Sequence, residues 1–212
     1  MGEQYDQAFW DERYRSQAAL WSGNPNSQVI AETADLAPGT ALDVGAGEGA
    51  DAIWLAKRGW HVTGVDISAV ALERAAGHAA EAGADVAGRI RWVQRDLTDG
   101  QPVPGRYDLV SAQYLHLPPT PRLALFASLA DAVAVGGTLL IVGHHPSDLQ
   151  TSVPRPQQPE RFFTGDDIAS QLDPAEWEII TNAAAPRDVT DPEGNPVTIH
   201  DTVLRARRRE QG

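Results

Sequence analysis

Apolar residues recur in short runs along residues 38–145, and amphipathic segments separate these runs. The runs have the length and composition of buried strands, whereas the intervening segments place apolar residues three and four positions apart, as helices do. Strands that alternate with helices predict an α/β fold with a mainly parallel sheet. The predicted strands cover residues 40–45, 61–67, 89–96, 107–115 and 136–145.

The two ends of the chain extend this core. Residues 144–161 are rich in proline and glutamine, which predicts an irregular loop, and long loops in compact domains are often active-site lids. Further helices are predicted at 5–16, 26–36 and 164–172, and further strands at 176–185 and 196–208. We therefore predict a single domain with four segments: a helical cap (1–37), a cofactor-binding core (38–145), an active-site loop (144–161) and a C-terminal helix with strands (162–212).

Composition narrows the classes of partner. The formal net charge of −12 disfavours nucleic acid, and the one basic cluster, Arg205–Arg209, is predicted to be a solvated tail. No apolar run approaches the ~20 residues of a membrane-spanning helix, and the N-terminal sequence lacks the features of a signal peptide. The absence of cysteine excludes disulfides and thiolate metal sites. We expect a cytoplasmic protein with neither a membrane nor a nucleic-acid partner.

The stretch "ALDVGAGEGADA" (41–52) places glycines between a strand and a helix, an arrangement that presents backbone N–H groups to a nucleotide. The dinucleotide pattern G-x-G-x-x-G/A fits Gly45, Gly47 and Ala50, and Asp66 follows at about the ~20 residues expected. A nicotinamide-dependent oxidoreductase is therefore one alternative. A P-loop is excluded, because no Lys-Ser/Thr pair follows the glycines.

Asp43 favours a different ligand. Its carboxylate precedes the first glycine by two residues, where it would repel a pyrophosphate but suit an ammonium group. A ligand that combines an amino acid with a nucleoside would satisfy Asp43 and Asp66 together, the first through its ammonium and the second through its ribose hydroxyls. S-adenosylmethionine is such a ligand.

Five segments in order now resemble one known family. They are "ALDVGAGEGADA", "VTGVDIS", "WVQRDL", "YDLVSAQYLHLP" and "GGTLLIVGHH", and together they resemble the class I S-adenosylmethionine-dependent methyltransferases. The segments "FWDERY" and "LWSGNPN" are similar to the tellurite-resistance and thiopurine methyltransferase-like subset. The resemblance implies a doubly wound, Rossmann-like sheet of seven strands, with helices on both faces and an antiparallel last strand.

The resemblance also implies roles at the methionine end of the cofactor. Gly45, Ala46 and Gly47 would contact the methionine part, and Asp43 would orient the turn or meet the ammonium through water. Gln113, at the end of the fourth strand, would lie near the sulfonium.

At the nucleoside end, the resemblance implies that Asp66 accepts hydrogen bonds from the ribose and that Ile67 packs on the adenine. Asp96 would take the adenine amino group, with Leu97 beside it. From the N-terminal segment, Trp21 and with it Tyr14 would cover the cofactor, since an aromatic face attracts a sulfonium cation.

Histidines after the fourth and fifth strands are the candidate general bases, because ligands bind at the carboxyl ends of such strands. His144 leads, followed by His116 and His145. The pair 144–145 could also begin a metal site with Asp148, Asp166 or Asp167, such as one for Mg²⁺, although no spacing supports a metal.

The acceptor is predicted to be a small molecule. The negative charge disfavours nucleic acid, and the motif Asp/Asn-Pro-Pro-aromatic of amino-directed nucleic-acid methyltransferases is absent after the fourth strand. Histidines favour O-methylation of a sugar or other alcohol, with S-adenosylhomocysteine as product. The alternatives are a thiol or metalloid acceptor, an NAD(P)-dependent oxidoreductase, and a non-catalytic cofactor-binding protein.

Overall fold

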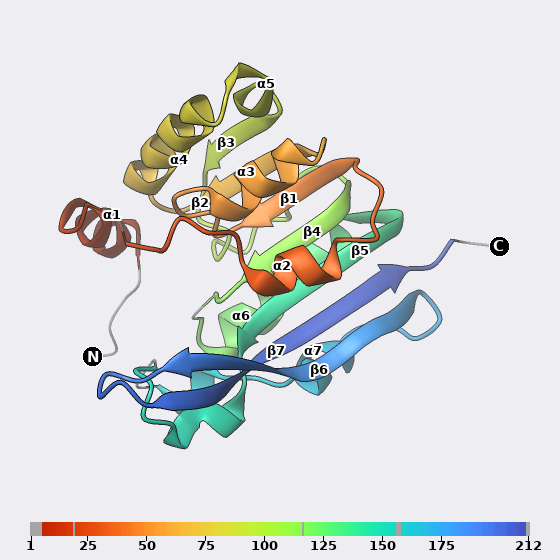
Figure 1. Ribbon diagram of the computed structural model, residues 1–212. Helices are drawn as coiled ribbons and strands as arrows, with labels where there is room; N and C mark the ends of the chain where they lie inside the picture. Colours follow the sequence, from red (N-terminus) through yellow and green to blue (C-terminus); the bar gives the residue numbers. More distant parts are fainter. Residues whose placement is uncertain (1–5, 19, 116, 156–157, 211–212) are drawn as a thin grey trace. The chain divides into compact units, whose positions relative to one another are not determined.

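The computed structural model describes residues 6–18, 20–115, 117–155 and 158–210 (Figure 1). Its described strands form a seven-stranded sheet in the order β3-β2-β1-β4-β5-β7-β6, in which β7 runs antiparallel to both of its neighbours. The predicted α/β class and the antiparallel final strand are confirmed. The chain divides into two compact units: unit 1 comprises residues 1–101 and 107–111, and unit 2 comprises residues 102–106 and 112–212.

Unit 1 contains three parallel strands, in which Thr63 of the middle strand pairs with Leu42 on one side and Arg91 on the other. Leu42 is fully buried, as the apolar run in that strand predicts. The elements are α1 (Gln7–Arg15), α2 (Ser27–Glu32), β1 (Thr40–Val44), α3 (Ala50–Lys57), β2 (His61–Asp66), α4 (Ala69–Glu81), α5 (Ala84–Ala87), β3 (Ile90–Gln94) and most of β4 (Tyr107–Gln113).

The helix after β2, α4, is followed by a second, short helix that was not predicted, α5. Ser68 is the N-cap of α4 and accepts a hydrogen bond from the Ala71 N–H. The helix ends at Glu81, because Gly83 adopts a φ of 117° and starts the short α5. The predicted helix at 26–36 is also shorter and covers only Ser27–Glu32.

Trp92 of β3 explains two of the glycines in unit 1. A Cβ at Gly64 would lie 2.5 Å from Trp92 Cζ3, and a Cβ at Gly49 would lie 2.8 Å from Trp92 Cη2. Real Cβ atoms do not approach other atoms this closely, so the indole packs directly on glycine backbone. The third glycine of the turn is thus a packing requirement, and its φ of 87° is one that residues with a Cβ rarely adopt.

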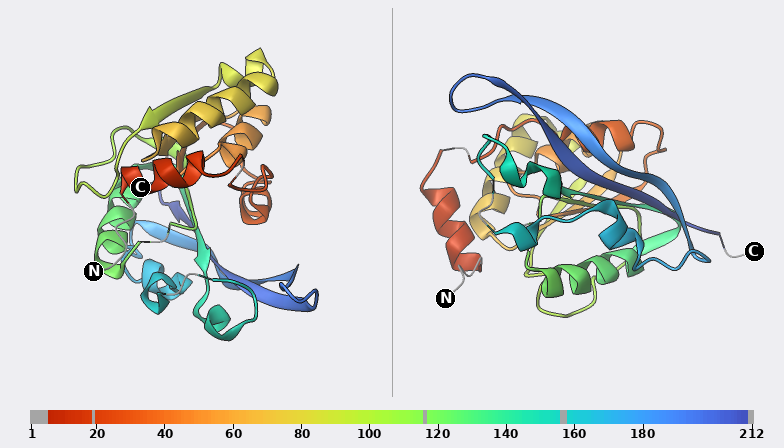
Figure 2. Two further views of the ribbon diagram at one scale, coloured as in Figure 1. Left: turned by 90° about the vertical axis from the view of Figure 1, so that its left-hand side faces the viewer. Right: turned by 90° about the horizontal axis from the view of Figure 1, so that it is seen from below.

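Unit 2 is built on β5, whose residues Leu139–Val142 are almost entirely buried, and on the long β6–β7 ribbon (Figure 2). Residues 144–161, predicted as irregular, contain two 3₁₀ turns. The elements are α6 (Pro119–Asp131), β5 (Val133–His144), the 3₁₀ turns η1 (Pro146–Gln150) and η2 (Pro159–Arg161), α7 (Gly165–Ala169), β6 (Trp177–Thr190) and β7 (Pro196–Arg208).

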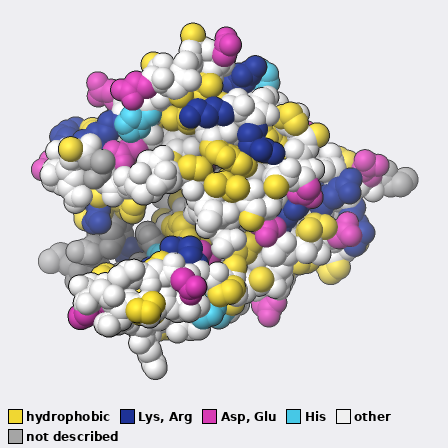
Figure 3. Space-filling view, viewed as in Figure 1, with side chains coloured by type: hydrophobic (Ala, Val, Ile, Leu, Met, Phe, Trp, Pro, Cys, Tyr) yellow, Lys and Arg dark blue, Asp and Glu magenta, His cyan; other side chains and the backbone are white. Residues whose placement is uncertain are grey.

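The C-terminal arginines are structural, so the prediction of a solvated tail is wrong. All of Arg205–Arg208 lies in β7. Arg208 Nη1 donates to the Val133 carbonyl over 2.9 Å, and Arg209 Nε donates to the Trp177 carbonyl over 3.2 Å. Strand pairing therefore uses these residues. On the face shown in Figure 3, acidic side chains are interspersed among the basic ones.

Candidate functional site

The glycine turn between β1 and α3 is held by β2. Gly45 and Ala46 donate their N–H groups to the Val65 carbonyl, over 2.8 and 3.0 Å, and the Gly47 N–H donates to Asp66 Oδ2 over 2.8 Å. Gly45 and Gly47 have φ values of 71° and 53°, which glycine adopts without strain. The structure therefore brings together four of the predicted cofactor residues, and Asp66 braces the turn.

Three carboxylates surround this turn. Asp43 and Asp66 are buried, and Asp51 lies in the first turn of α3, where one of its oxygens accepts from the Asn26 N–H over 2.6 Å. Asp43 accepts a hydrogen bond from the Ala52 N–H, and its Oδ2 has no hydrogen-bond partner among the described residues. A buried, unsatisfied carboxylate oxygen is costly, so a ligand that supplies positive charge would be stabilised here.

Burial raises the pKa of all three carboxylates. Burial is the main reason that the pKa of Asp43 lies well above its usual value, and the charges of Asp51 and Asp66 add to the effect. Burial likewise raises the pKa of Asp51 to about 6. It also raises the pKa of Asp66, although the hydrogen bonds from the N–H groups of Ser68 and Gly47 act in the opposite direction. A cation bound beside the turn would relieve this repulsion.

Tyr14 and Trp21 lie against the glycine turn. A Cβ at Gly47 would lie 3.0 Å from the Tyr14 hydroxyl and 3.5 Å from Trp21 Nε1. The indole N–H donates to the Tyr14 hydroxyl over 3.0 Å, and burial raises the pKa of that hydroxyl. Tyr14 is buried, whereas half of Trp21 is exposed. The sequence predicted both residues near the cofactor, and the structure places both beside the turn.

Glu48 and Arg74 fasten this N-terminal segment, and neither residue was predicted from the sequence. Glu48 Oε2 accepts from the N–H groups of Leu20 and Trp21 over 3.1 and 3.2 Å. Arg74 Nη1 contacts Glu48 Oε1 over 2.9 Å, and Arg74 Nη2 donates to the carbonyls of Tyr14 and Gln17 over 2.6 and 2.8 Å. One ion pair thus connects the glycine turn, α4 and residues 14–21.

A second attachment lies at the N-terminus of α4. Ser68 Oγ donates to Asp11 Oδ1 over 2.6 Å, and the Val70 N–H donates to the same oxygen over 3.4 Å. Burial raises the pKa of Asp11, but the hydrogen bonds outweigh it and the net pKa is lowered. The carboxylate of α1 therefore complements the positive end of α4.

The predicted adenine contacts follow the neighbouring strands β2 and β3. Ile67 and Leu97 are half-buried, and Asp96 is exposed. Asp96 Oδ1 accepts from the N–H and the hydroxyl of Thr98, over 2.8 and 2.6 Å, so that oxygen organises its own turn. These positions are in unit 1 with Asp66.

The predicted cofactor residue Gln113 and the candidate base His144 lie in unit 2. Gln113 ends β4 and is half-buried, and His144 ends β5. The His144 ring centroid lies 4.9 Å from that of Tyr114 and 5.8 Å from that of Phe162. Tyr114 has a φ of 50°, which is uncommon for a residue other than glycine and is frequent at functional sites. His116 lies outside the described residues.

An ion pair beside these rings was not predicted. Arg187 of β6 forms two hydrogen bonds with Asp201 of β7, over 3.0 and 3.1 Å, and it also hydrogen-bonds the side chain of Tyr114. Asp201 is fully buried and pairs with His144 in the sheet. The hydrogen bond to Asp201 raises the pKa of Arg187. The pair holds β6, β7 and the residue after β4 together.

The carboxylates considered for a metal have other partners. Asp166 accepts from Asn182 Nδ2 over 2.6 Å, and Asp167 accepts from Thr164 in the capping box of α7. Among the described residues, no group of three or more histidine or acidic side chains is arranged to hold a metal ion.

Residues 41–137 match the sequence family described as a methyltransferase domain. This segment of the chain is therefore similar to a methyltransferase domain. This segment includes the glycine turn, Asp66 and Asp96, and the resemblance identified from the sequence is confirmed over it.

Two curated relatives share part of this domain. An uncharacterised methyltransferase of Mycobacterium tuberculosis is 36% identical over 124 residues, which are 58% of this chain and 59% of the relative. Ribosomal RNA small subunit methyltransferase C of Alcanivorax borkumensis is 41% identical over 73 residues, 34% of this chain and 21% of that protein. The chain thus covers less than two thirds of the length of either relative.

Solved structures share the fold over more of the chain. A structure concerned with the conversion of a disulfide bond into a thioacetal group during echinomycin biosynthesis has a TM-score of 0.74 and 22% identity, covering 97% of this chain and 93% of that chain. The glycopeptide N-methyltransferase MtfA complexed with S-adenosylmethionine has a TM-score of 0.61 and 18% identity, covering 88% and 95%. In the part of the chain that the structure describes, every helix is too short or too polar to span a membrane.

Proposed function

We propose that the chain transfers a methyl group from S-adenosylmethionine to a small molecule and releases S-adenosylhomocysteine. The observation that carries the proposal is the group of three carboxylates, Asp43, Asp51 and Asp66, around a glycine turn. When bound, S-adenosylmethionine supplies a methyl group on a positively charged sulfur, and its amino-acid part carries an ammonium group. The match to a methyltransferase domain and the structure of MtfA with this cofactor support the same ligand.

The residues present fit this ligand. Asp43 Oδ2, which has no hydrogen-bond partner among the described residues, is an acceptor for the ammonium directly or through water. Asp66 is oriented by the N–H groups of Gly47 and Ser68, which supports a role for its carboxylate in accepting hydrogen bonds from ribose hydroxyls. Tyr14 and Trp21 supply aromatic surface beside Gly47, where attraction to a sulfonium is worth ~0.5–2 kcal/mol.

A calorimetric titration with S-adenosylmethionine and NADP tests the cofactor. The same carboxylates that favour a cation would repel a pyrophosphate, so we expect saturable binding of S-adenosylmethionine and none of NADP. Binding of NADP alone would overturn the proposal and favour an oxidoreductase.

Substitution of Asp66 tests the orientation of the cofactor. Asp66→Ala removes charge-assisted hydrogen bonds and is expected to weaken the binding of S-adenosylmethionine by ~1.5–3 kcal/mol, which raises its Kd about 10- to 150-fold. Asp85→Asn, at an exposed position of α5, is the matched control. If Asp66→Ala bound the cofactor as tightly as the control, the ribose would lie elsewhere.

For the acceptor, we propose a hydroxyl group on a sugar or other alcohol. An uncharged alcohol must lose its proton during the reaction, whereas a thiol is already partly ionised, and unit 2 provides histidines for this step. The net charge of −12 supports a small molecule over a nucleic acid, in keeping with the cytoplasmic location predicted from the sequence. The fold itself hosts several acceptor chemistries and does not choose among them.

Transfer of a radiolabelled methyl group to hydroxyl and thiol compounds tests the acceptor class. His144, which lies between the rings of Tyr114 and Phe162, is the residue predicted from the sequence as base. If His144 is the base, His144→Ala lowers turnover and leaves cofactor affinity unchanged. Turnover equal to wild type would remove His144 from the mechanism, and methylation of thiols alone would replace the hydroxyl proposal.

A further inference from the structure

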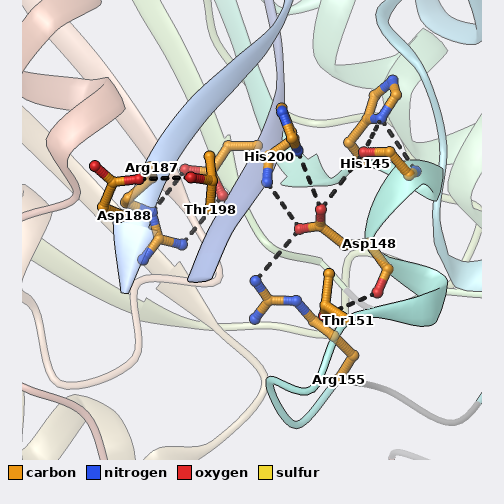
Figure 4. A network of polar contacts seen from close by, with 10 residues as sticks. His145, Asp148, Thr151, Arg155, Arg187, Asp188, Thr198 and His200 are labelled. Atoms are coloured by element: carbon orange, nitrogen blue, oxygen red, sulfur yellow. Dashed lines mark hydrogen bonds and ion pairs between the residues drawn. The ribbon is translucent and has the colours of Figure 1, made fainter. Parts of the chain in front are cut away.

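Asp148 is the centre of a polar cluster in unit 2 (Figure 4). It lies in η1, directly after β5, and is 1% exposed. Its Oδ2 accepts from the His200 N–H over 2.8 Å and lies 3.4 Å from Arg155 Nη2, and its Oδ1 lies 3.3 Å from His200 Nδ1. A buried carboxylate thus holds both the backbone and the ring of His200, a residue that neither the sequence nor the family match singled out.

The hydrogen-bond partners of two histidines in this cluster, His200 and His145, indicate opposite tautomers. His200 Nδ1 faces the Asp148 carboxylate, which only accepts hydrogen bonds, so a neutral His200 carries its proton on Nδ1. Its Nε2 then has a lone pair. His145 Nδ1 instead accepts from the Ser147 N–H over 3.2 Å, so a neutral His145 carries its proton on Nε2 and is a donor there.

The surroundings of His200 suit a proton acceptor. Its side chain is 34% exposed, and its ring centroid lies 6.4 Å from that of His145. An aspartate that orients a histidine fixes the tautomer and stabilises the imidazolium that forms. The charged groups nearby are Arg155, which shares Asp148, and the Arg187–Asp201 pair, whose charges balance.

We propose that His200, oriented by Asp148, is the base that takes the proton of a hydroxyl acceptor. The inference rests on the proposed methyltransferase function and assigns its base to His200 in place of His144. As the acceptor oxygen forms its bond to the methyl carbon, the carbon–sulfur bond of the donor breaks and its electron pair returns to sulfur. The hydroxyl proton moves to His200 Nε2, and Asp148 balances the imidazolium charge.

The tautomer can be measured without an acceptor. The full chain, labelled with ¹⁵N in its histidines and saturated with S-adenosylhomocysteine, is examined by NMR above pH ~8, where imidazole is neutral. His200→Gln and His145→Gln assign the signals. We expect His200 to be protonated at Nδ1 and His145 at Nε2, and Asp148→Asn to shift His200 toward the other tautomer. A His200 protonated at Nε2 in the wild-type chain would overturn the proposal.

Turnover separates a base from a structural brace. Phenol and thiophenol serve as probes with a radiolabelled methyl donor, because the thiol is largely ionised before it reacts. His200→Gln is expected to lower phenol methylation by about 100-fold or more, and thiophenol methylation by only a few-fold. His61→Gln, at an exposed position of β2, is the control.

An equal decrease in the methylation rates of both probes would show that His200 is a structural residue and would overturn the proposal. An unchanged rate of phenol methylation would also overturn it. If the wild-type chain methylates neither probe, the tautomer measurement decides. Calorimetric binding of S-adenosylmethionine to His200→Gln keeps the two proposals distinct: normal binding leaves the cofactor proposal standing, whatever the rate.

Discussion

Replacement of Arg74 by methionine would release the N-terminal segment from the glycine turn. The change removes the 2.9 Å contact with Glu48 and the hydrogen bonds of 2.6 and 2.8 Å to the carbonyls of Tyr14 and Gln17. The Glu48 side chain is 6% exposed and that of Arg74 is 24% exposed. Hydrogen bonds to charged groups are worth ~1.5–3 kcal/mol each, but partial exposure and the two contacts that Glu48 retains reduce the sum, so we expect a local loss of ~2–3 kcal/mol.

Hydrogen exchange measured by mass spectrometry reads this loss directly. A decrease of ~2–3 kcal/mol in the free energy of local opening corresponds to exchange about 30- to 150-fold faster in peptides that cover residues 14–21, with no change in peptides from β5. Affinity for S-adenosylmethionine is expected to fall about 2- to 30-fold, because Tyr14 and Trp21 no longer stay beside Gly47.

Arg58→Met is the control for this experiment. Arg58 makes a 3.4 Å hydrogen bond to the Ala34 carbonyl and lies over the Trp54 ring, away from residues 14–21. Exchange in residues 14–21 that is the same in both variants would refute the role of the Arg74–Glu48 pair.

Three further predictions concern charge and packing. Burial raises the pKa of Asp51 to about 6, so the unliganded fold loses stability as pH rises from ~4 through ~6, whereas a bound cation favours the ionised carboxylate. The gain in melting temperature from S-adenosylmethionine should therefore be larger above pH ~7 than below pH ~5. A gain that does not depend on pH would contradict this. Gly64→Ala forces a Cβ to 2.5 Å from Trp92 and should cost ~1–3 kcal/mol in urea unfolding; wild-type stability would show that the indole moves freely. Arg187→Met leaves buried Asp201 without its cation and should cost ~2 kcal/mol, less than the ~3–5 of a fully buried pair because Arg187 is 36% exposed; an unchanged melting temperature would refute it.

The elements with a long, regular pattern were predictable from the sequence. Each predicted strand is present, because a buried strand in a parallel sheet needs a continuous apolar run. The short α5 was missed, since four residues give no helical period, and β5 begins at Val133, before the predicted 136. The helix predicted at 26–36 covers only Ser27–Glu32, because the ends of helices are the part that a sequence pattern defines least well.

The candidate site divides in the same way. Gly45, Gly47 and Asp66 form one local motif, so their proximity follows from the strand–turn–helix order. Arg74 with Glu48, and His200 with Asp148, are pairs separated by 26 and 52 residues. The local sequence around either residue does not indicate such a pair, because the contact forms only when the fold brings distant segments together.

The contacts of Asp11, Tyr14 and Trp21 with the rest of unit 1 bear on where this protein can be truncated. The segment that matches the methyltransferase domain begins at residue 41, yet Tyr14 and Trp21 lie against its glycine turn, and Asp11 binds the start of α4. A fragment trimmed to the matched boundaries would expose Glu48 and lose the aromatic cover of Gly47. Expression designs should therefore begin upstream of Asp6, whose side chain caps α1.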